Sequence, residues 1–244
     1  MQFVHTEIYP ITTYHTDRFG RTKPACLLHF AQEAAQEHCY SLGVDWDTMA
    51  KRNLFWAVIR QRMEITRLPE AGETITVKTW PMPTSRVAYP RATEGFDAQG
   101  NSIFKIISLW VLMDFETRAM VLPGKSDVEV LGTTFGTELK APAGLPAANF
   151  DHQMIRPVCF TDLDRNGHMN NTRYLEWLAD LLPASFHQDH PVKAVTISYN
   201  SEALEGQQVE LTWSEEGALR VDGLLSQTDV TGKNTRIFSA QMEF

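Results

Sequence analysis

The sequence predicts an α+β fold made of two successive units, each an antiparallel sheet wrapped around a helix. A long helical pattern covers residues 24–42 and is followed by alternating strands. A second helical pattern covers 172–182 and is again followed by strands. The segment 17–21, Asp-Arg-Phe-Gly-Arg, also matches 164–168, Asp-Arg-Asn-Gly-His, at an offset of 147 residues.

The size and composition of the chain indicate a folded protein with one large domain or two of about 120 residues. The chain has 244 residues, is 43% hydrophobic and carries a formal net charge of −8, which argues against a general nucleic-acid binder. The cysteines, Cys26, Cys39 and Cys159, are far apart and odd in number, so we expect reduced thiols in a cytoplasmic protein. The N-terminal residues alternate like a strand and show neither a basic leader nor an apolar core segment, so we expect no signal or transit peptide. No apolar run approaches the roughly 20 residues that a transmembrane helix needs.

The first unit is expected to begin with a strand over residues 3–15. A long helix follows at Pro24–Leu42, where Pro24 suits the first helical turn, and a short helical piece follows at Asp45–Arg52. The strands of the sheet are expected at 55–65, 73–80, 86–96 and 102–115.

The stretch from Pro123 to Phe150 is rich in Pro, Gly and Ala and predicts a partly packed connection between the units. The second unit then repeats the order of the first, with a strand, a helix and further strands at 154–160, 172–182, 192–202, 207–213, 218–226 and 235–244. We therefore expect an N-terminal repeat over 1–125, a connection over 126–152 and a C-terminal repeat over 153–244.

The richest polar segment is Thr161–Trp177, in the second unit. If its first half is extended, the side chains at every second position share one face, namely Asp162, Asp164, Asn166, His168 and Asn170. Its second half begins a helix, for which Asn170, Asn171 and Thr172 are all plausible N-caps. Free N–H groups at such a helix start can polarise a carbonyl.

The polar segment is one-sided, because the first unit has Phe19 and Arg21 where the second has Asn166 and His168. We therefore expect one reactive site per chain.

The segment Asp162–Asn171 resembles the DLDxNxHxNN segment of the acyl-[acyl-carrier-protein] thioesterases, a family of plant plastid enzymes and bacterial relatives. Trp56–Trp80 resembles the family's first-repeat strands, Leu109–Arg118 its WVxMNxxTR stretch, and Ile197–Glu202 the strand that carries a functional Glu. The resemblance runs nearly end to end. The family's fold is a tandem hotdog, which agrees with the repeat described above.

This resemblance implies a hydrolase that releases a fatty acid from the acyl-phosphopantetheine arm of acyl-carrier protein without a cofactor. By motif position, it implies functional roles for Asp164, Asn166, His168 and Glu202. Plant members often have Cys directly after that Glu, whereas this chain has Ala203, so a thiol nucleophile is not available there.

Thioester hydrolysis needs an attacking water, a base and donors for the developing oxyanion. We hypothesise that Glu202, alone or with His168, activates the water. Asn166 and backbone N–H groups at the start of the 172–182 helix would donate hydrogen bonds to the carbonyl oxygen. Asp164 would orient Asn166 or the residues that lead into the helix. Substrate contacts are also expected at the helix start, from Asn170 and Asn171.

Each of these residues also has a structural interpretation. Asp and Asn before a helix commonly cap it or form turns, a single His in a loop is more often structural, and Glu202 could be a solvated strand residue. Cys159 is expected to be a buried apolar thiol rather than a nucleophile. The sequence contains no GxSxG and no HExxH, so we expect neither an α/β-hydrolase elbow nor a metal.

Two further sets of residues are candidates for substrate recognition. The best local basic cluster could steer docking of an acidic carrier protein, or could be ordinary exposed strand charge; it consists of Arg60, Arg62 and Arg67. The apolar face of the first helix is ordinary core that could also line the acyl chain; it includes Leu27, Phe30, Ala31 and Ala34.

Other functions stay open on the same scaffold. An acyl-CoA thioesterase would differ in its leaving group, a non-catalytic acyl-binding protein would leave the thioester intact, and a hotdog dehydratase would act on 3-hydroxyacyl groups. The sequence leaves open the chain length and branching of the acyl group and whether the chain forms a homodimer.

Overall fold

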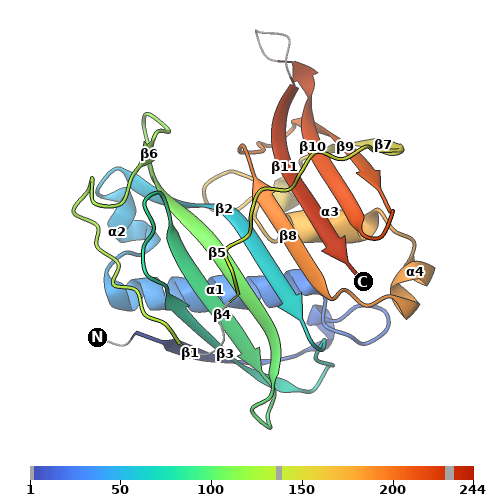
Figure 1. Cartoon of the computed structure of the whole chain (residues 1–244), viewed down its shortest axis with the longest axis horizontal. Coiled ribbons are helices and arrows are strands. Elements are labelled where there is room, and N and C mark those ends of the chain that lie inside the picture. Colours follow the sequence, from blue (N-terminus) through green and yellow to red (C-terminus); the bar gives the residue numbers. More distant parts are fainter. Residues whose placement is uncertain (1–2, 136–138, 229–233) are drawn as a thin grey trace. The chain divides into compact units, whose positions relative to one another are not determined.

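Two α+β units follow one another along the chain, Met1–Pro142 and Ala143–Phe244. In this computed structural model, the structure describes residues 3–135, 139–228 and 234–244. Each unit combines an antiparallel sheet with helices, which confirms the predicted fold class (Figure 1). Within these described ranges, no helix is both long and apolar enough to span a bilayer.

The sheet of the first unit has the strand order β1-β3-β4-β5-β2, with the short β6 paired to β5. All of these pairs are antiparallel. The strands span β1 His5–Pro10, β2 Leu54–Ile65, β3 Thr74–Pro81, β4 Tyr89–Phe96, β5 Ser102–Asp114 and β6 Met120–Val121.

Helix α1 spans Pro24–Leu42, the range predicted from the sequence. It packs against β1 and β3, and Figure 1 shows it lying across one face of the sheet of its unit. Pro24 starts the helix, and Gly43 ends it in a left-handed conformation at φ 68°. Helix α2, Trp46–Ala50, is capped by the Asp45 side chain, which accepts the Thr48 N–H at 3.1 Å.

The sheet of the second unit has the order β8-β11-β10-β9-β7, and again all pairs are antiparallel. Its strands span β7 His152–Pro157, β8 Ala194–Tyr199, β9 Gln208–Ser214, β10 Leu219–Thr228 and β11 Asn234–Glu243. Helix α3, Arg173–Asp180, is shorter than α1. A further helix, α4 at Ala184–Asp189, was missed by the sequence analysis because Pro183, which ends the first helical run, also begins this one.

The internal repeat extends to individual backbone hydrogen bonds. The N–H of Asp17 donates to the carbonyl of Arg21 at 2.8 Å, and the N–H of Asp164 donates to that of His168 at the same distance. The same offset relates the 3₁₀ turns at 13–15 and 160–162. The repeat predicted from residue matches is therefore present in the backbone.

Side-chain packing follows the same register. Phe30 of α1 stacks on Tyr9 of β1, with ring centroids 4.7 Å apart. At the equivalent positions in the second unit, the guanidinium of Arg156 lies over the ring of Trp177 at 4.7 Å. In each unit, the helix is thus anchored to the first strand by one aromatic residue at the same position.

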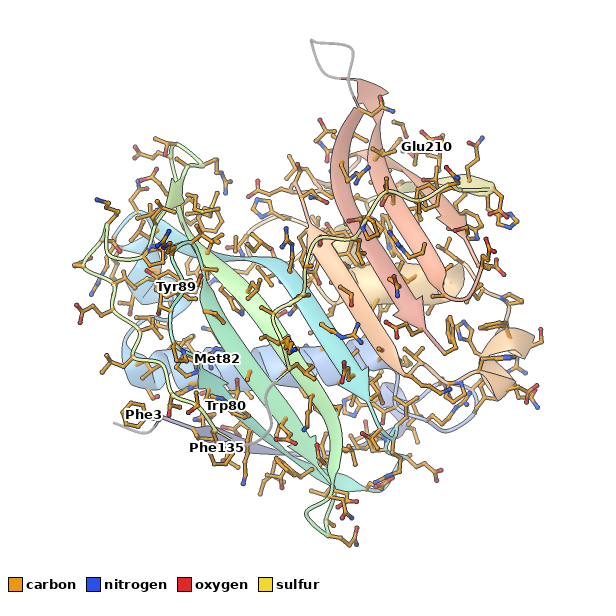
Figure 2. The ribbon with its side chains drawn as sticks, viewed as in Figure 1. Phe3, Trp80, Met82, Tyr89, Phe135 and Glu210 are labelled. Atoms are coloured by element: carbon orange, nitrogen blue, oxygen red, sulfur yellow. The ribbon has the colours of Figure 1, made fainter. Side chains whose placement is uncertain are left out.

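The connection between the repeats contains no helix or strand in its described part, residues 123–135 and 139–150. The N–H of Thr133 donates to the carbonyl of Pro81 at 2.8 Å. The ring of Phe135 packs edge-on against Trp80 at 5.1 Å, and Figure 2 labels both side chains. This stretch is thus held against the first unit. The boundaries at 1–125, 126–152 and 153–244 stay a prediction.

Several predicted strands are shorter in the structure. The first strand of each unit ends at a proline, Pro10 or Pro157, and a 3₁₀ turn follows. Strand β8 ends at Tyr199 rather than at 202. The N–H groups of Asn200 and Ser201 both donate to the carbonyl of Ile237, at 2.8 and 3.2 Å, so the ladder stops there.

Candidate active site

The polar segment 161–170 forms a tight turn, so the extended conformation considered in the sequence analysis is wrong. The Asp164 carboxylate accepts the N–H groups of Asn166 and His168, at 2.7 and 3.4 Å. Gly167 adopts φ 77°, a left-handed conformation that glycine tolerates best. The polar side chains are therefore gathered by a loop whose acceptor is Asp164, and not by one face of a strand.

His168 and Glu202 form the central side-chain contact of the second unit. Nε2 of His168 lies 3.2 Å from Oε2 of Glu202. The backbone brings them together, because His168 forms a bridge with Leu204 and the Met169 N–H donates to the Ala203 carbonyl at 2.9 Å. The His168 side chain is 14% exposed and that of Glu202 is 42% exposed, so the carboxylate is accessible to water while the ring is held in the fold.

Asn166 lies beside the carboxylate that organises the turn. Its side-chain amide nitrogen donates to Oδ2 of Asp164 at 3.4 Å, a long hydrogen bond. Asp164 thus contacts both the backbone and the side chain of Asn166, and its predicted role in orienting Asn166 stays a prediction.

Of the three predicted N-cap candidates, Thr172 is the N-cap residue of α3, and Asn170 forms a turn just before it. Oδ1 of Asn170 accepts from both the N–H and the hydroxyl of Thr172, each at 2.9 Å. The neighbouring Asn171 accepts the hydroxyl of Tyr199 on its backbone carbonyl, at 3.2 Å. In the part of the chain that the structure describes, the N–H and side-chain amide of Asn171 make no hydrogen bond. These donors are therefore available at the helix start.

The first unit serves as an internal reference for this site. Arg21 occupies the position of His168 and pairs with Asp17, with 3.5 Å between Nε and Oδ2. Leu68 occupies the position of Glu202. The carbonyl of the residue after Leu68, Pro69, accepts the Thr22 N–H, just as the carbonyl of the residue after Glu202, Ala203, accepts the Met169 N–H. The same turn therefore exists in both units, whereas the first unit has Arg21 and Leu68 at the positions of the His168–Glu202 pair.

The predicted contacts on the first helix are all buried in the core of the first unit: Leu27, Phe30, Ala31 and Ala34. Their exposed fractions are at most 5%, as expected for ordinary core residues. Their role in acyl binding stays a prediction.

The arginines predicted to dock a carrier protein differ in their pairing. Arg67 makes a bidentate contact with Glu73 at 2.7 and 2.8 Å, which holds the pKa of that carboxyl below its ordinary value. Arg62 donates to Glu64 at 2.9 Å. Arg60 donates to the carbonyl of Pro142 at 3.5 Å, and no carboxylate in the described part of the chain pairs with it.

Cys159 is exposed, so the expected buried thiol is wrong. It precedes the 3₁₀ turn at 160–162, and its N–H donates to Asp162 at 2.9 Å. Across residues 3–135, 139–228 and 234–244, no three His, Cys, Asp or Glu side chains gather in a way that could hold a metal ion.

Two tyrosines of this region received no role from the sequence. The rings of Tyr174 and Tyr199 meet edge to face, 5.3 Å apart. Burial raises the pKa of both hydroxyls well above the ordinary value, and the Asp164 carboxylate raises that of Tyr174 further. Both hydroxyls therefore keep their protons. Their pairing spans two elements far apart in the sequence, so local periodicity could not reveal it.

Comparisons with known proteins give matches over nearly the whole chain. A family model described as the acyl-ACP thioesterase N-terminal domain matches residues 2–123, and one described as the acyl-ACP thioesterase C-terminal domain matches 148–242. The dodecanoyl-[acyl-carrier-protein] hydrolase, chloroplastic, of Cinnamomum camphora is 27% identical, and the match covers 82% of this chain and 56% of the relative. The chain spans about half the length of the first curated relatives that it matches.

Two solved structures share the fold along their full length. An acyl-ACP thioesterase from Bacteroides thetaiotaomicron has a TM-score of 0.87 at 22% identity, covering 99% of this chain and 97% of its own. The 12:0-ACP thioesterase from Umbellularia californica has a TM-score of 0.80 at 23% identity, covering 100% and 97%. The predicted tandem hotdog fold is thereby confirmed.

Proposed function

Because the chain belongs to the acyl-ACP thioesterase family, we propose that it hydrolyses the thioester of fatty acyl-[acyl-carrier protein]. The products would be a free fatty acid and the carrier protein with its free phosphopantetheine thiol. The observation that carries the proposal is the 3.2 Å contact between His168 Nε2 and Glu202 Oε2 in a chain of this family.

The His168–Glu202 pair supplies the base. A water held against the partly exposed Glu202 carboxylate can pass its proton to that carboxylate, or to the imidazole beside it, while its oxygen attacks the thioester carbonyl carbon. The contact with Glu202 also fixes the orientation of the ring. The positive charge that builds on the imidazole when it takes a proton lies next to a carboxylate.

Donors near the turn stabilise the negative charge that develops on the carbonyl oxygen. We assign this role to the Asn166 amide, oriented by Asp164, and to the donors of Asn171 at the start of α3. The tetrahedral intermediate then collapses and the C–S bond breaks. Because a thiolate is a good leaving group, no dedicated general acid is required, and the proton taken from water can return to sulfur through the base.

Carrier-protein docking is the second part of the proposal. Acyl-carrier proteins are acidic, so a basic residue without a carboxylate partner would attract them. Arg60 fits that requirement better than Arg62 and Arg67, whose charges are already offset by Glu64 and Glu73.

The test is the release of free fatty acid from carrier-protein thioesters and from CoA thioesters of several acyl chain lengths. We expect release with a preference for the carrier protein, and a large loss of rate in His168→Ala and Glu202→Ala. Binding of the acyl thioester without release would contradict hydrolysis and favour an acyl-binding protein. Equal kcat/KM with both leaving groups would contradict the carrier-protein preference alone.

The same panel of chain lengths also addresses the first helix. If Leu27, Phe30, Ala31 and Ala34 line the acyl chain, enlarging Ala31 or Ala34 should change the chain-length preference. The cytoplasmic location and the homodimer stay predictions.

A further inference from the structure

Tyr199 links the two segments that carry the candidate site of the second unit. It is the last residue of β8, three residues before Glu202, and its hydroxyl donates to the backbone carbonyl of Asn171 at 3.2 Å. Asn171 lies between Asn170, whose side chain accepts the Thr172 N–H, and the start of α3. One hydroxyl therefore ties the Glu202 segment to the helix start.

The tyrosine ring is buried against a neighbouring aromatic ring, which restricts the position of its hydroxyl. Tyr199 meets Tyr174 of α3 edge to face, and Tyr174 in turn packs on Phe238 with centroids 4.9 Å apart. Phe238 is also the partner of Tyr199 in the β8–β11 ladder. Because burial keeps its hydroxyl protonated, Tyr199 acts as a hydrogen-bond donor at neutral pH.

The first unit shows that the fold does not need this hydroxyl. Ile65 pairs with Phe104 in β5, as Tyr199 pairs with Phe238 in β11. The backbone corner that follows is the same, because Thr66 and Arg67 both donate to the carbonyl of Ile103, at 2.8 and 3.2 Å.

The residues of the first unit that correspond to Tyr174 and Asn171 are also apolar. At an offset of 147 residues, Leu27 takes the place of Tyr174 and Pro24 that of Asn171. The Tyr199 hydroxyl and the Asn171 amide thus occur in the unit that has the His168–Glu202 pair, and the first unit has Ile65 and Pro24 in their places. A purely structural role at this corner would not require them.

We propose that Tyr199 is a positioning residue for thioester hydrolysis, which holds Asn171 so that its side-chain amide donates to the thioester carbonyl oxygen. This inference rests on the proposed function. The Asn171 amide makes no hydrogen bond in the described part of the chain, so it is free to take a substrate. An oxyanion donor stabilises the transition state only while it stays aligned, and the Tyr199 hydroxyl supplies that alignment from outside the loop.

The test compares Tyr199→Phe with Tyr89→Phe. Tyr89 of β4, labelled in Figure 2, is buried, and its hydroxyl has no hydrogen-bond partner among the described residues, so its removal serves as the matched control. We expect Tyr199→Phe to lower kcat about tenfold with KM unchanged, as for loss of a transition-state contact, and Tyr89→Phe to match the wild type. Both variants should keep the wild-type melting temperature within a few degrees.

A double-mutant cycle shows whether Tyr199 acts through Asn171. Asn171→Ala should lower kcat, and adding Tyr199→Phe to it should cost little more, because the amide that Tyr199 positions is already gone. Fully additive losses would overturn the inference, as would a wild-type kcat in Tyr199→Phe.

The two proposals can fail separately. Hydrolysis by the wild type together with an unaffected Tyr199→Phe would overturn the positioning role alone. Absence of hydrolysis by the wild type would overturn the proposed function and the positioning role with it.

Discussion

Nε2 of His168 lies 3.2 Å from Oε2 of Glu202, whereas the equivalent positions of the first repeat hold Arg21 and Leu68. The backbone around the two positions is the same in both units, down to the hydrogen bonds of the turn. The chain therefore contains its own reference for the site, with the same turn but without the His168–Glu202 contact. Several predictions can be tested by making the same substitution in each repeat.

Asp164 and Asp17 form such a matched pair. Each carboxylate accepts two backbone N–H groups of its turn, at 2.7 and 3.4 Å for Asp164 and at 2.8 and 3.1 Å for Asp17. Replacing either one by Ala should lower the free energy of unfolding by about 1–3 kcal/mol, because the donors lose an anionic acceptor. Urea titration measures this loss.

The two variants should differ in activity. In Asp164→Ala the folded enzyme should lose hydrolysis, because Asn166 and His168 lose their alignment, whereas folded Asp17→Ala should keep it. Equal loss of activity per folded molecule in both variants would show that the carboxylates act through stability alone.

Within the basic cluster, Arg60 is predicted to contribute most to the attraction of the carrier protein. The charges of the other two arginines, Arg62 and Arg67, are offset by Glu64 and Glu73. Arg60→Glu should raise KM for carrier-protein thioesters several-fold and leave KM for CoA thioesters unchanged. The effect should shrink as salt is added, because salt screens the long-range attraction between the enzyme and an acidic carrier protein. Lys125→Glu, an exposed charge reversal elsewhere in the first unit, is the control. A shift of equal size in both variants would point to net charge rather than to a docking site.

Gly95 and Gly223 are expected to be essential for packing in their sheets. A Cβ at Gly95 would lie 2.0 Å from the ring of Phe104, and one at Gly223 would lie 2.2 Å from the ring of Phe238. Each Gly→Ala substitution should lower the free energy of unfolding by about 1–3 kcal/mol through overpacking. Replacing the Phe104 ring by the smaller Leu side chain should relieve the clash. Gly95→Ala should therefore cost less stability in the Phe104→Leu background than in the wild type. An equal cost in both backgrounds, measured by chemical denaturation, would contradict this explanation.

Asp222 is expected to make stability depend on pH. Burial raises its pKa, and the Arg236 guanidinium, 3.0 Å away, only partly offsets this effect. Because the folded state then binds the proton more tightly than the unfolded chain, stability falls as pH rises from the ordinary value of 3.8 through the raised pKa. Asp222→Asn removes the titrating group. The stability of the variant relative to the wild type should therefore increase as the pH rises through this range.

Thermal unfolding of the wild type and Asp222→Asn between about pH 4 and pH 7 measures this difference. A difference in melting temperature that does not change with pH would contradict the assignment to Asp222.

Much of the fold could be predicted because its signals are local and strong. Pro24 and Gly43 mark the ends of α1, and the alternation of apolar residues locates most strands to within a few positions. The offset between Asp17 and Asp164 also gave the correct register of the repeat.

The details of the site could not be predicted in the same way. Polar residues at every second position suggested a strand, but the Asp164 carboxylate and the positive φ of Gly167 favour a turn. The end of β8 depends on the Ile237 carbonyl, which lies far along the chain. The link from Tyr199 to Asn171 likewise joins two elements that only the folded structure brings together.

The most direct test of the central claim is kcat/KM for hydrolysis of one good acyl-carrier-protein thioester by four proteins. These are the wild type, His168→Ala, Glu202→Gln and Glu205→Gln, the last removing an exposed carboxylate from the same loop. We predict losses of about 100-fold or more for His168→Ala and Glu202→Gln, as for loss of general-base catalysis, and wild-type values for Glu205→Gln. Full activity in Glu202→Gln would contradict the claim that the His168–Glu202 pair activates the water.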